Sequence, residues 1–366
     1  MDILSPGEQI YIKNGLLQGC RTDGRFPMEF RPILVETNVL DQCLGSSKVR
    51  IGTRLEGTEA IVGIKGIFEP INPELIEKID EHVVVYPEVE VFVNFAPGVD
   101  LTSLVPTSRI QLTEKRYFTH LKNDNASGSN DGSEAAEPQV NVTDNLISDQ
   151  GTVIGAVASE KPHEDIFSDY FTKLFNPACL GSSSDSKSSM FYPLSVSNCK
   201  PGKWKLSVDV VIVEYHGSLL DCISMACRSA FSTTQLPFID SEEVYMSDFI
   251  SVKNLPLTTT CYMMPATTRS SESASASLIS KTNSSDLFFD VTPEEEACLP
   301  CRVVISASGD GTIRQMAKEG SKGEEPPISL SDLMQVRTSA LAAINQVIEL
   351  VDGMVKKNQQ NKNSSE

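Results

Sequence analysis

The chain has 366 residues, of which 40% are hydrophobic, so it is long enough to bury a sizeable core in one large domain or two smaller ones. Its 31 basic and 49 acidic residues give a net charge of −18. This charge argues against a protein that grips nucleic acid by itself, because phosphates are bound mainly through Lys and Arg, although the chain could line an RNA path beside basic partners.

A short helix and several strands are predicted in the first hundred residues. Ser5-Pro6-Gly7-Glu8 has the form of a capping box with proline in the first turn, and the helix is expected to end near Gly15. Pro87 interrupts the last of the strand-like stretches, so that stretch is expected at a sheet edge or broken in two. The predicted strands cover residues 32–37, 48–53, 58–68 and 82–95.

Three polar segments are predicted to be disordered insertions. Residues 123–145 contain five acids, no Lys or Arg and no aromatic residue, and eight of the eighteen residues at 268–285 are serine. We therefore expect one domain over residues 5–355, interrupted at about 123–162, 181–190 and 268–285. Residues 356–366 are expected to form a flexible tail.

The second half contains both predicted helices and predicted strands. Residues 165–175 and 219–231 place apolar side chains at helical spacing, and a closing helix is predicted from Ser329. The expected strands are 205–215, 287–290, 302–307 and 312–316, the last two joined as a hairpin through 309–311. Without regular β-α-β alternation, this order predicts an α+β fold with helices packed on mixed sheets.

Three motifs allow a catalytic or metal-binding reading and a structural one. The lone C-x-x-C at Cys298 and Cys301 has no second pair, so two buried thiols are favoured over zinc or redox chemistry. His216, Ser218 and Asp221 supply the residue types of a triad without its nucleophile elbow. The acidic run 294–296 suits Mg²⁺ or, more commonly, the first turn of a helix.

Cysteine usage and the N-terminus bear on location. The nine cysteines are scattered, and MDILSPGEQI lacks the basic and apolar regions of a signal peptide. No apolar run approaches the roughly 20 residues of a membrane span. A reducing cytosolic or nuclear location without membrane contact is expected, with free thiols.

Cations gather in two early places. The stretch RTDGRFPMEFRPILVE at 21–36 carries three arginines, which could contact RNA or could tie an N-terminal arm to a sheet by binding carboxylates and carbonyls. The following hairpin is a possible RNA-facing or acid-facing patch, and a solvated strand face is the plainer alternative. The patch residues are Lys48, Arg50, Arg54 and Lys65.

Four segments, in order, resemble the RNase PH-type proteins. The first is R-x-D-G-R followed by R-P, and the second is GSSKVRIGTRLEGTEAIVGIKG. The third is WKLSVDVVIVEYHGSLLDCISMACRSAFSTTQLP, and the fourth is DVTPEEEACLPCRVVISASGDGTI. The resemblance covers most of residues 5–122, 163–180 and 191–355, and it implies the RNase PH-like fold, related to domain 2 of ribosomal protein S5. The signature residues of the first segment are Arg21, Asp23, Gly24, Arg25 and Arg31.

The resemblance also implies a degenerate phosphate site. Active members have a pattern like A-D-G-G-T-R-T after the central strand, whereas this chain has Tyr215-His216-Gly217-Ser218-Leu219-Leu220-Asp221, with leucine at the position of the arginine. Of the paired acids near the later hairpin, only Asp290 remains. The helix that is arginine-rich in active members holds only Lys173. The degenerate positions are His216, Gly217, Ser218, Leu220 and Asp290.

The pattern is most similar to exosome ring subunits of the non-catalytic class related to the inactive archaeal ring half. The resemblance therefore implies a structural ring subunit without metal or cofactor. Its partners would be other RNase PH-like subunits, S1/KH-type cap proteins and RNA. Its expected roles are rRNA maturation and mRNA turnover in nucleus, nucleolus and cytoplasm. The alternatives are an active phosphate-dependent 3′→5′ exoribonuclease and an RNA-binding module acting alone.

Overall fold

The structure is a computed structural model, and it describes residues 4–70, 88–99, 163–175, 202–240, 243–246, 250, 252–264, 286–320 and 328–363. The three predicted insertions lie outside the described residues. Within the described part, no helix is long and apolar enough to cross a membrane.

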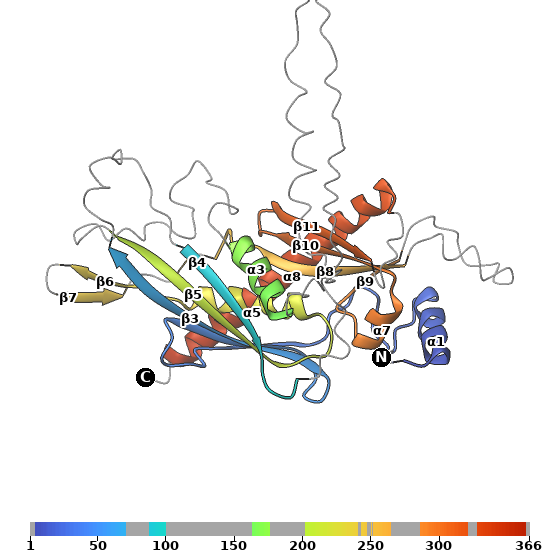
Figure 1. Cartoon of the computed structure of the whole chain (residues 1–366), viewed down its shortest axis with the longest axis horizontal. Helices are drawn as coiled ribbons and strands as arrows, with labels where there is room; N and C mark the ends of the chain where they lie inside the picture. Colours follow the sequence, from blue (N-terminus) through green and yellow to red (C-terminus); the bar gives the residue numbers. More distant parts are fainter. Residues whose placement is uncertain are drawn as a thin grey trace, which may run out of the picture.

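Two sheets form the body of the molecule (Figure 1). The larger has the order β1-β2-β3-β5-β4, with β4 parallel to β5 and the other neighbours antiparallel. The smaller is antiparallel with the order β11-β10-β8-β9, and β6 (Pro237–Asp240) and β7 (Glu243–Met246) form a separate hairpin. The larger sheet comprises β1 (Ile33–Thr37), β2 (Gly45–Gly52), β3 (Gly57–Pro70), β4 (Glu88–Phe95) and β5 (Gly202–Glu214). The smaller comprises β8 (Leu257–Met264), β9 (Asp286–Phe289), β10 (Cys301–Ala307) and β11 (Ile313–Gly320).

The helix α5 (Leu219–Ser232) joins the two sheets into one core. It contacts β2 and β3 of the larger sheet and β8 of the smaller, and nearly all of its residues are buried. A single hydrophobic cluster therefore runs from β1 to the C-terminal helix. The other helices are α1 (Pro6–Leu17), α3 (His163–Phe175), α7 (Pro293–Cys298) and α8 (Leu330–Asn363).

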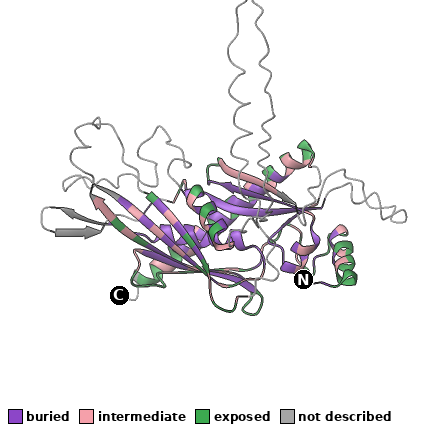
Figure 2. Ribbon diagram, viewed as in Figure 1, coloured by how far each residue is buried: buried purple, intermediate pink, exposed green. Residues whose placement is uncertain are grey.

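Strand alternation gives the larger sheet one apolar and one polar face. Along β2, Val49 and Ile51 are completely buried, while Lys48 and Arg50, which alternate with them, are partly exposed. The alternation of purple with pink and green along these strands is visible in Figure 2. The covered face packs against α5, so the buried face of each strand follows from the two-residue period of the sequence.

Most of the predicted elements are present. The expected α+β class is confirmed, and the Ser5–Glu8 capping box starts α1, which ends two residues beyond the predicted Gly15. The apolar faces predicted for residues 165–175 and 219–231 are buried. The seven cysteines among the described residues are free, and Cys298 and Cys301 are both buried.

The structure places residues 356–363, the first part of the predicted flexible tail, in a helix. The helix α8 continues through these polar residues to Asn363. Asn358 Nδ2 donates a hydrogen bond to the Val35 carbonyl on the edge strand β1 at 2.8 Å. Gln359 Nε2 donates to the Ser232 carbonyl at the end of α5 at 3.5 Å. The polar side chains therefore cover backbone acceptors of the body, a role that composition does not reveal.

Candidate functional site

Arg31 and Asp290 form the centre of the site. Asp290 follows β9 with a left-handed φ of +47° and is completely buried. Arg31 Nε and Nη2 donate to both of its carboxylate oxygens at 2.6–3.1 Å, and the Arg31 backbone N–H donates to Oδ2 at 2.7 Å. Such a bidentate pair fixes both side chains in one geometry.

Arg21 forms a second buried pair beside the first. Its Nη2 and Nε donate to the Glu295 carboxylate at 2.6 and 3.2 Å. Its Nη1 donates to the Phe289 carbonyl at 3.0 Å, and its Nη2 also donates to the Asp290 carbonyl at 2.8 Å. Glu295 is held in place by the capping box that it forms with Thr292 at the start of α7.

Arg25 completes the network at its solvent side. Its Nη1 donates to Asp290 Oδ2 at 3.1 Å and its Nη2 to the Asp290 carbonyl at 2.9 Å. Its Nε donates to Asp23 Oδ2 at 2.6 Å, across a turn in which Gly24 has a φ of +78°. Residues 21–31, which form an arm before β1, are therefore attached through their arginines to the end of β9 and to α7.

The network keeps Asp290 ionised. Burial raises the pKa of this carboxyl, but the hydrogen bonds and charges of Arg31 and Arg25 outweigh burial, and the pKa lies below its ordinary value. Since Arg31 and Arg25 bind both of its oxygens, the carboxylate is engaged rather than available as a base.

The turn between β5 and α5 lies directly against this network. Arg31 Nη1 donates to the His216 carbonyl at 2.7 Å, so the structure brings the arm residues and the degenerate phosphate positions together. Gly217 has a φ of +84°, and an added Cβ would collide with the Val291 carbonyl. The Ser218 hydroxyl is buried without a hydrogen-bond partner among the described residues. Leu220 is also buried and belongs to the apolar core.

Asp221 was considered in the sequence only as part of a triad, and it has another environment. Its carboxylate accepts hydrogen bonds from the hydroxyls of Thr260 at 2.8 Å and Thr259 at 3.3 Å on β8. It therefore does not orient His216, and the triad is not assembled. Burial raises its pKa to about 7 despite these hydrogen bonds. The result is a buried acid that titrates near neutrality.

The candidate RNA-facing cations lie elsewhere. Lys48 and Arg50 bind Glu59 on the outer face of the larger sheet, and Lys65 binds Asp209 at 2.8 Å. Arg54 is exposed in the β2–β3 loop, and Lys173 is exposed in the last turn of α3. The structure does not gather these cations with the Asp290 site, and local carboxylates offset the charges of Lys48, Arg50 and Lys65.

Glu295 and Glu296 were missed as binding partners in the sequence. Glu295 binds Arg21, and Glu296 Oε1 accepts from Arg302 Nη1 at 2.7 Å. The spacing Thr292-x-x-Glu295 signals a capping box, but it does not identify an arginine 274 residues away. No cluster of three or more His, Cys, Asp or Glu side chains placed to hold a metal ion occurs among the described residues.

Comparison with known proteins agrees with this fold. The chain is 22% identical to a Dictyostelium discoideum protein named as an exosome complex exonuclease, RRP42, over 97% of this chain and 99% of that one. It is 25% identical to the exosome component Rrp42 of Methanothermobacter thermautotrophicus, over 41% of this chain and 49% of that one. No family profile matches the chain.

Solved structures show the same architecture. A chain of the Archaeoglobus fulgidus exosome, solved with RNA bound to its active site, superposes with a TM-score of 0.58 at 16% identity, covering 95% of this chain and 99% of that one. The fold is therefore the RNase PH-like fold. Sequence and fold together confirm the resemblance to RNase PH-like exosome ring proteins, and the sequence similarity to the Dictyostelium protein extends over almost the whole chain.

Proposed function

We propose that this chain is a non-catalytic structural subunit of an exosome ring. The observation that carries the proposal is that Arg31 and Arg25 engage Asp290, while Leu220, in the apolar core, occupies the position of the arginine of active relatives. Phosphorolysis needs cationic and backbone donors that hold phosphate beside an anionic RNA. Leu220 provides no charge, and the arginines that remain nearby are committed to carboxylates.

The arginines of the arm have an architectural role in this proposal. They tie residues 21–31 to β9 and α7 through carboxylates and carbonyls, and they stabilise the turn at His216. Three guanidinium groups bound in this way offer few donors to RNA. Of the degenerate positions, His216, Gly217 and Ser218 then serve as a structural turn, and Leu220 packs in the apolar core as part of α5.

The proposed partners of this chain are inferred from the exosome proteins that it resembles. We infer that residues 5–355 form one domain that pairs with other RNase PH-like subunits in a six-member ring, beneath S1/KH-type cap proteins. RNA would pass through the ring to a separate nuclease, in rRNA maturation and mRNA turnover. The same proposal gives location in nucleus, nucleolus and cytoplasm. Lys48, Arg50, Arg54, Lys65 and Lys173 are candidates for RNA or subunit contacts.

Assembly can be tested by co-expression. The chain expressed alone is expected to behave poorly in solution, and co-expression with an RNase PH-like partner is expected to give a defined complex by size-exclusion chromatography with light scattering. Mass spectrometry of proteins that co-purify with the tagged chain would identify its neighbours. A stable lone monomer that ignores such partners would contradict ring membership.

An active phosphate-dependent exoribonuclease is the second candidate. The word exonuclease in the name of the Dictyostelium relative favours it. The purified chain, alone and in its complex, is expected to release no nucleoside diphosphates from poly(A) when phosphate is present. Phosphate-dependent release that disappears in a folded Asp290→Asn variant would favour the enzyme instead.

A further inference from the structure

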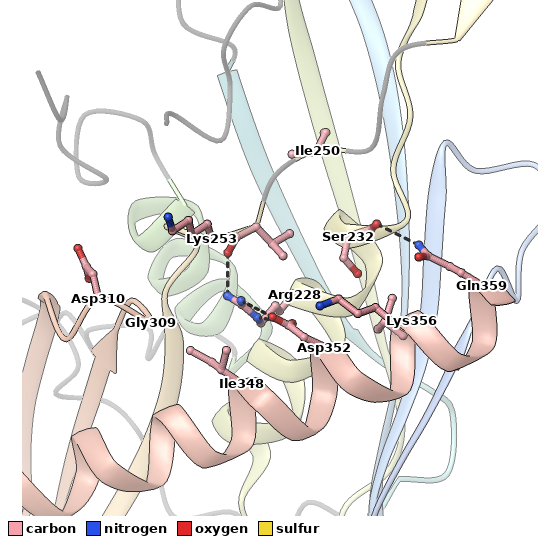
Figure 3. Close-up of a pocket in the computed structure, with 12 residues that line it drawn as sticks. Arg228, Ser232, Ile250, Lys253, Gly309, Asp310, Ile348, Asp352, Lys356 and Gln359 are labelled. Carbon is pink, nitrogen blue, oxygen red and sulfur yellow. Dashed lines mark hydrogen bonds and ion pairs between the residues drawn. The ribbon is translucent and has the colours of Figure 1, made fainter. Parts of the chain in front are cut away.

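A pocket of about 480 Å³ lies beside the C-terminal half of α5, away from the site at its N-terminus (Figure 3). Arg228 lies eight residues after Leu220 on the same helix, which corresponds to about 12 Å along its axis. The other walls are α8, the three residues Ile250, Val252 and Lys253, and the turn of the β10–β11 hairpin at Gly309 and Asp310. The pocket is therefore separate from the degenerate phosphate site.

The Arg228–Asp352 pair is the fixed base of the pocket. Arg228 Nε and Nη2 bind the Asp352 carboxylate on α8 at 3.0 and 2.9 Å, while Nη1 donates to the carbonyls of Val252 and Leu255 at 2.9 and 2.8 Å. The guanidinium is almost completely buried. It joins three elements and is engaged by the protein itself, so it shapes the pocket rather than serving as its receptor.

Aliphatic side chains line the walls. Ile348 and Val355 are buried and lie seven residues apart, so both project from the same side of α8. Ile250 and Val252 face the cavity from the segment before β8. These four side chains offer an apolar space that suits a single aliphatic or aromatic group.

Two lysines stand at the rim. Figure 3 shows Lys253 and Lys356 on either side of the Arg228–Asp352 pair. Both are exposed, and neither forms an ion pair with the described residues. Asp310 is nearby, and it accepts hydrogen bonds from the N–H and hydroxyl of Thr312 at 2.9 and 2.8 Å. The pocket thus has three cations against two carboxylates in a chain whose net charge is −18.

We propose that this pocket binds a short acidic segment of a partner protein. One apolar side chain of the segment enters between Ile250, Ile348 and Val355, and its Asp or Glu neighbours pair with Lys253 and Lys356. The complementary charge of the rim selects acidic flanks, and the aliphatic walls select the anchor. The proposal goes beyond ring membership, because it concerns a surface for an additional protein and does not depend on RNA.

RNA suits the same pocket less well. Among the described residues that line the pocket there is no aromatic side chain on which a base could stack, and stacking is a main source of single-strand affinity. The Arg228 guanidinium is already engaged by Asp352 and by two backbone carbonyls, so it offers no free pair of donors to a phosphate. An acidic peptide needs only one apolar anchor and two point charges, which the pocket supplies.

A labelled peptide tests the proposal directly. The probe is a fluorescein-labelled ten-residue peptide with one Phe between blocks of Asp and Glu, and fluorescence anisotropy measures its binding to the full chain or its co-purified complex. Combined Lys253→Glu and Lys356→Glu substitutions are expected to weaken binding about tenfold or more. Lys357→Glu, the matched control next to Lys356 and outside the pocket lining, is expected to leave binding unchanged.

Two further comparisons make the outcome decisive. A peptide with Ser in place of Phe is expected to bind at least about tenfold more weakly, and the intact peptide is expected to shift the methyl resonances of Ile250 and Ile348. Equal loss in the Lys357→Glu control, no binding of the Phe peptide, or stronger binding of a single-stranded RNA at the same lysines would overturn the proposal. Ring assembly is measured separately by light scattering, so failure of the peptide does not imply failure of ring membership.

Discussion

The arm arginines and Lys65 are close together in the sequence, but they have opposite environments in the structure. Arg21 and Arg31 are buried, and the side chains of their partners Glu295 and Asp290 are fully shielded from solvent. In the Lys65–Asp209 pair on the outer face of the larger sheet, the side chains are 61% and 36% exposed. All three pairs have close contacts of 2.6–2.8 Å, so distance alone does not distinguish them.

The difference is one of desolvation. Burial of an ion pair removes both charges from water, and their mutual attraction offsets this cost. Loss of one partner therefore leaves an uncompensated charge in the core. The two side chains of an exposed pair are well solvated whether or not the pair forms, so the pair contributes little to the free energy of unfolding. The arm is thus held by contacts that must be complete, whereas the outer sheet face tolerates the loss of the exposed Lys65–Asp209 pair.

The largest expected effect is that of Arg31→Ala. This change leaves the buried Asp290 carboxylate without its main partner and removes the contact to the His216 carbonyl. We expect a loss of about 3–5 kcal/mol in the free energy of unfolding, measured by urea denaturation of the chain in its co-purified complex.

Arg54→Ala is the matched control, because Arg54 is exposed in the β2–β3 loop. We expect it to change stability by less than about 0.5 kcal/mol. If Arg31→Ala were as mild as this control, the arm network would not be the stabilising element that its geometry indicates.

Asp221 sharpens the comparison, since it is a buried carboxylate that accepts hydrogen bonds from threonine hydroxyls, whereas Asp290 is bound by arginines. Its folded pKa of about 7 lies above that of an unfolded aspartate, so its contribution to stability is complete below about pH 4 and declines as the pH rises through 7. The pKa of Asp290 moves in the opposite direction, and its contribution is lost as the pH falls below the unfolded value.

This difference predicts a measurable pH dependence. Between pH 5.5 and 8, ionisation of Asp221 is expected to lower the free energy of unfolding by about 2 kcal/mol. Asp221→Asn should remove most of this slope, measured by urea denaturation at both pH values, and Asp209→Asn on the exposed sheet face should not. An unchanged slope in Asp221→Asn would show that another group titrates in this range.

The fold could be predicted well because its signals are local. The Ser5–Glu8 capping box, the strand alternation in β2 and the apolar face of α3 each follow from a few neighbouring residues. The end of α8 could not be predicted in this way. Asn358 and Gln359 are favoured there by carbonyls on β1 and α5, which are more than one hundred residues away in the sequence.

The site could be predicted only in part for the same reason. The sequence pointed to Arg21, Arg31 and Asp290 as notable residues, but the pairing of Arg31 with Asp290 spans 259 positions. At Glu295 the sequence predicted only the start of a helix. At Asp221 it suggested a catalytic triad that the structure does not assemble. Burial and long-range pairing decide the properties of these side chains, and neither is encoded at short spacing.

The smallest expected effect is that of Lys65→Ala on the outer sheet face. Loss of the Lys65–Asp209 pair should change the free energy of unfolding by less than about 1 kcal/mol, because water replaces the lost partner on both sides. The remaining effect should shrink further near 1 M salt, where the screening length falls to about 3 Å. Urea denaturation of Lys65→Ala and Arg31→Ala at low and high salt measures both trends together. A salt-independent loss of stability in Lys65→Ala as large as that in Arg31→Ala would mean that this sheet face is covered in the assembled protein. The contrast between Lys65 and the arm arginines would then hold only for the isolated chain.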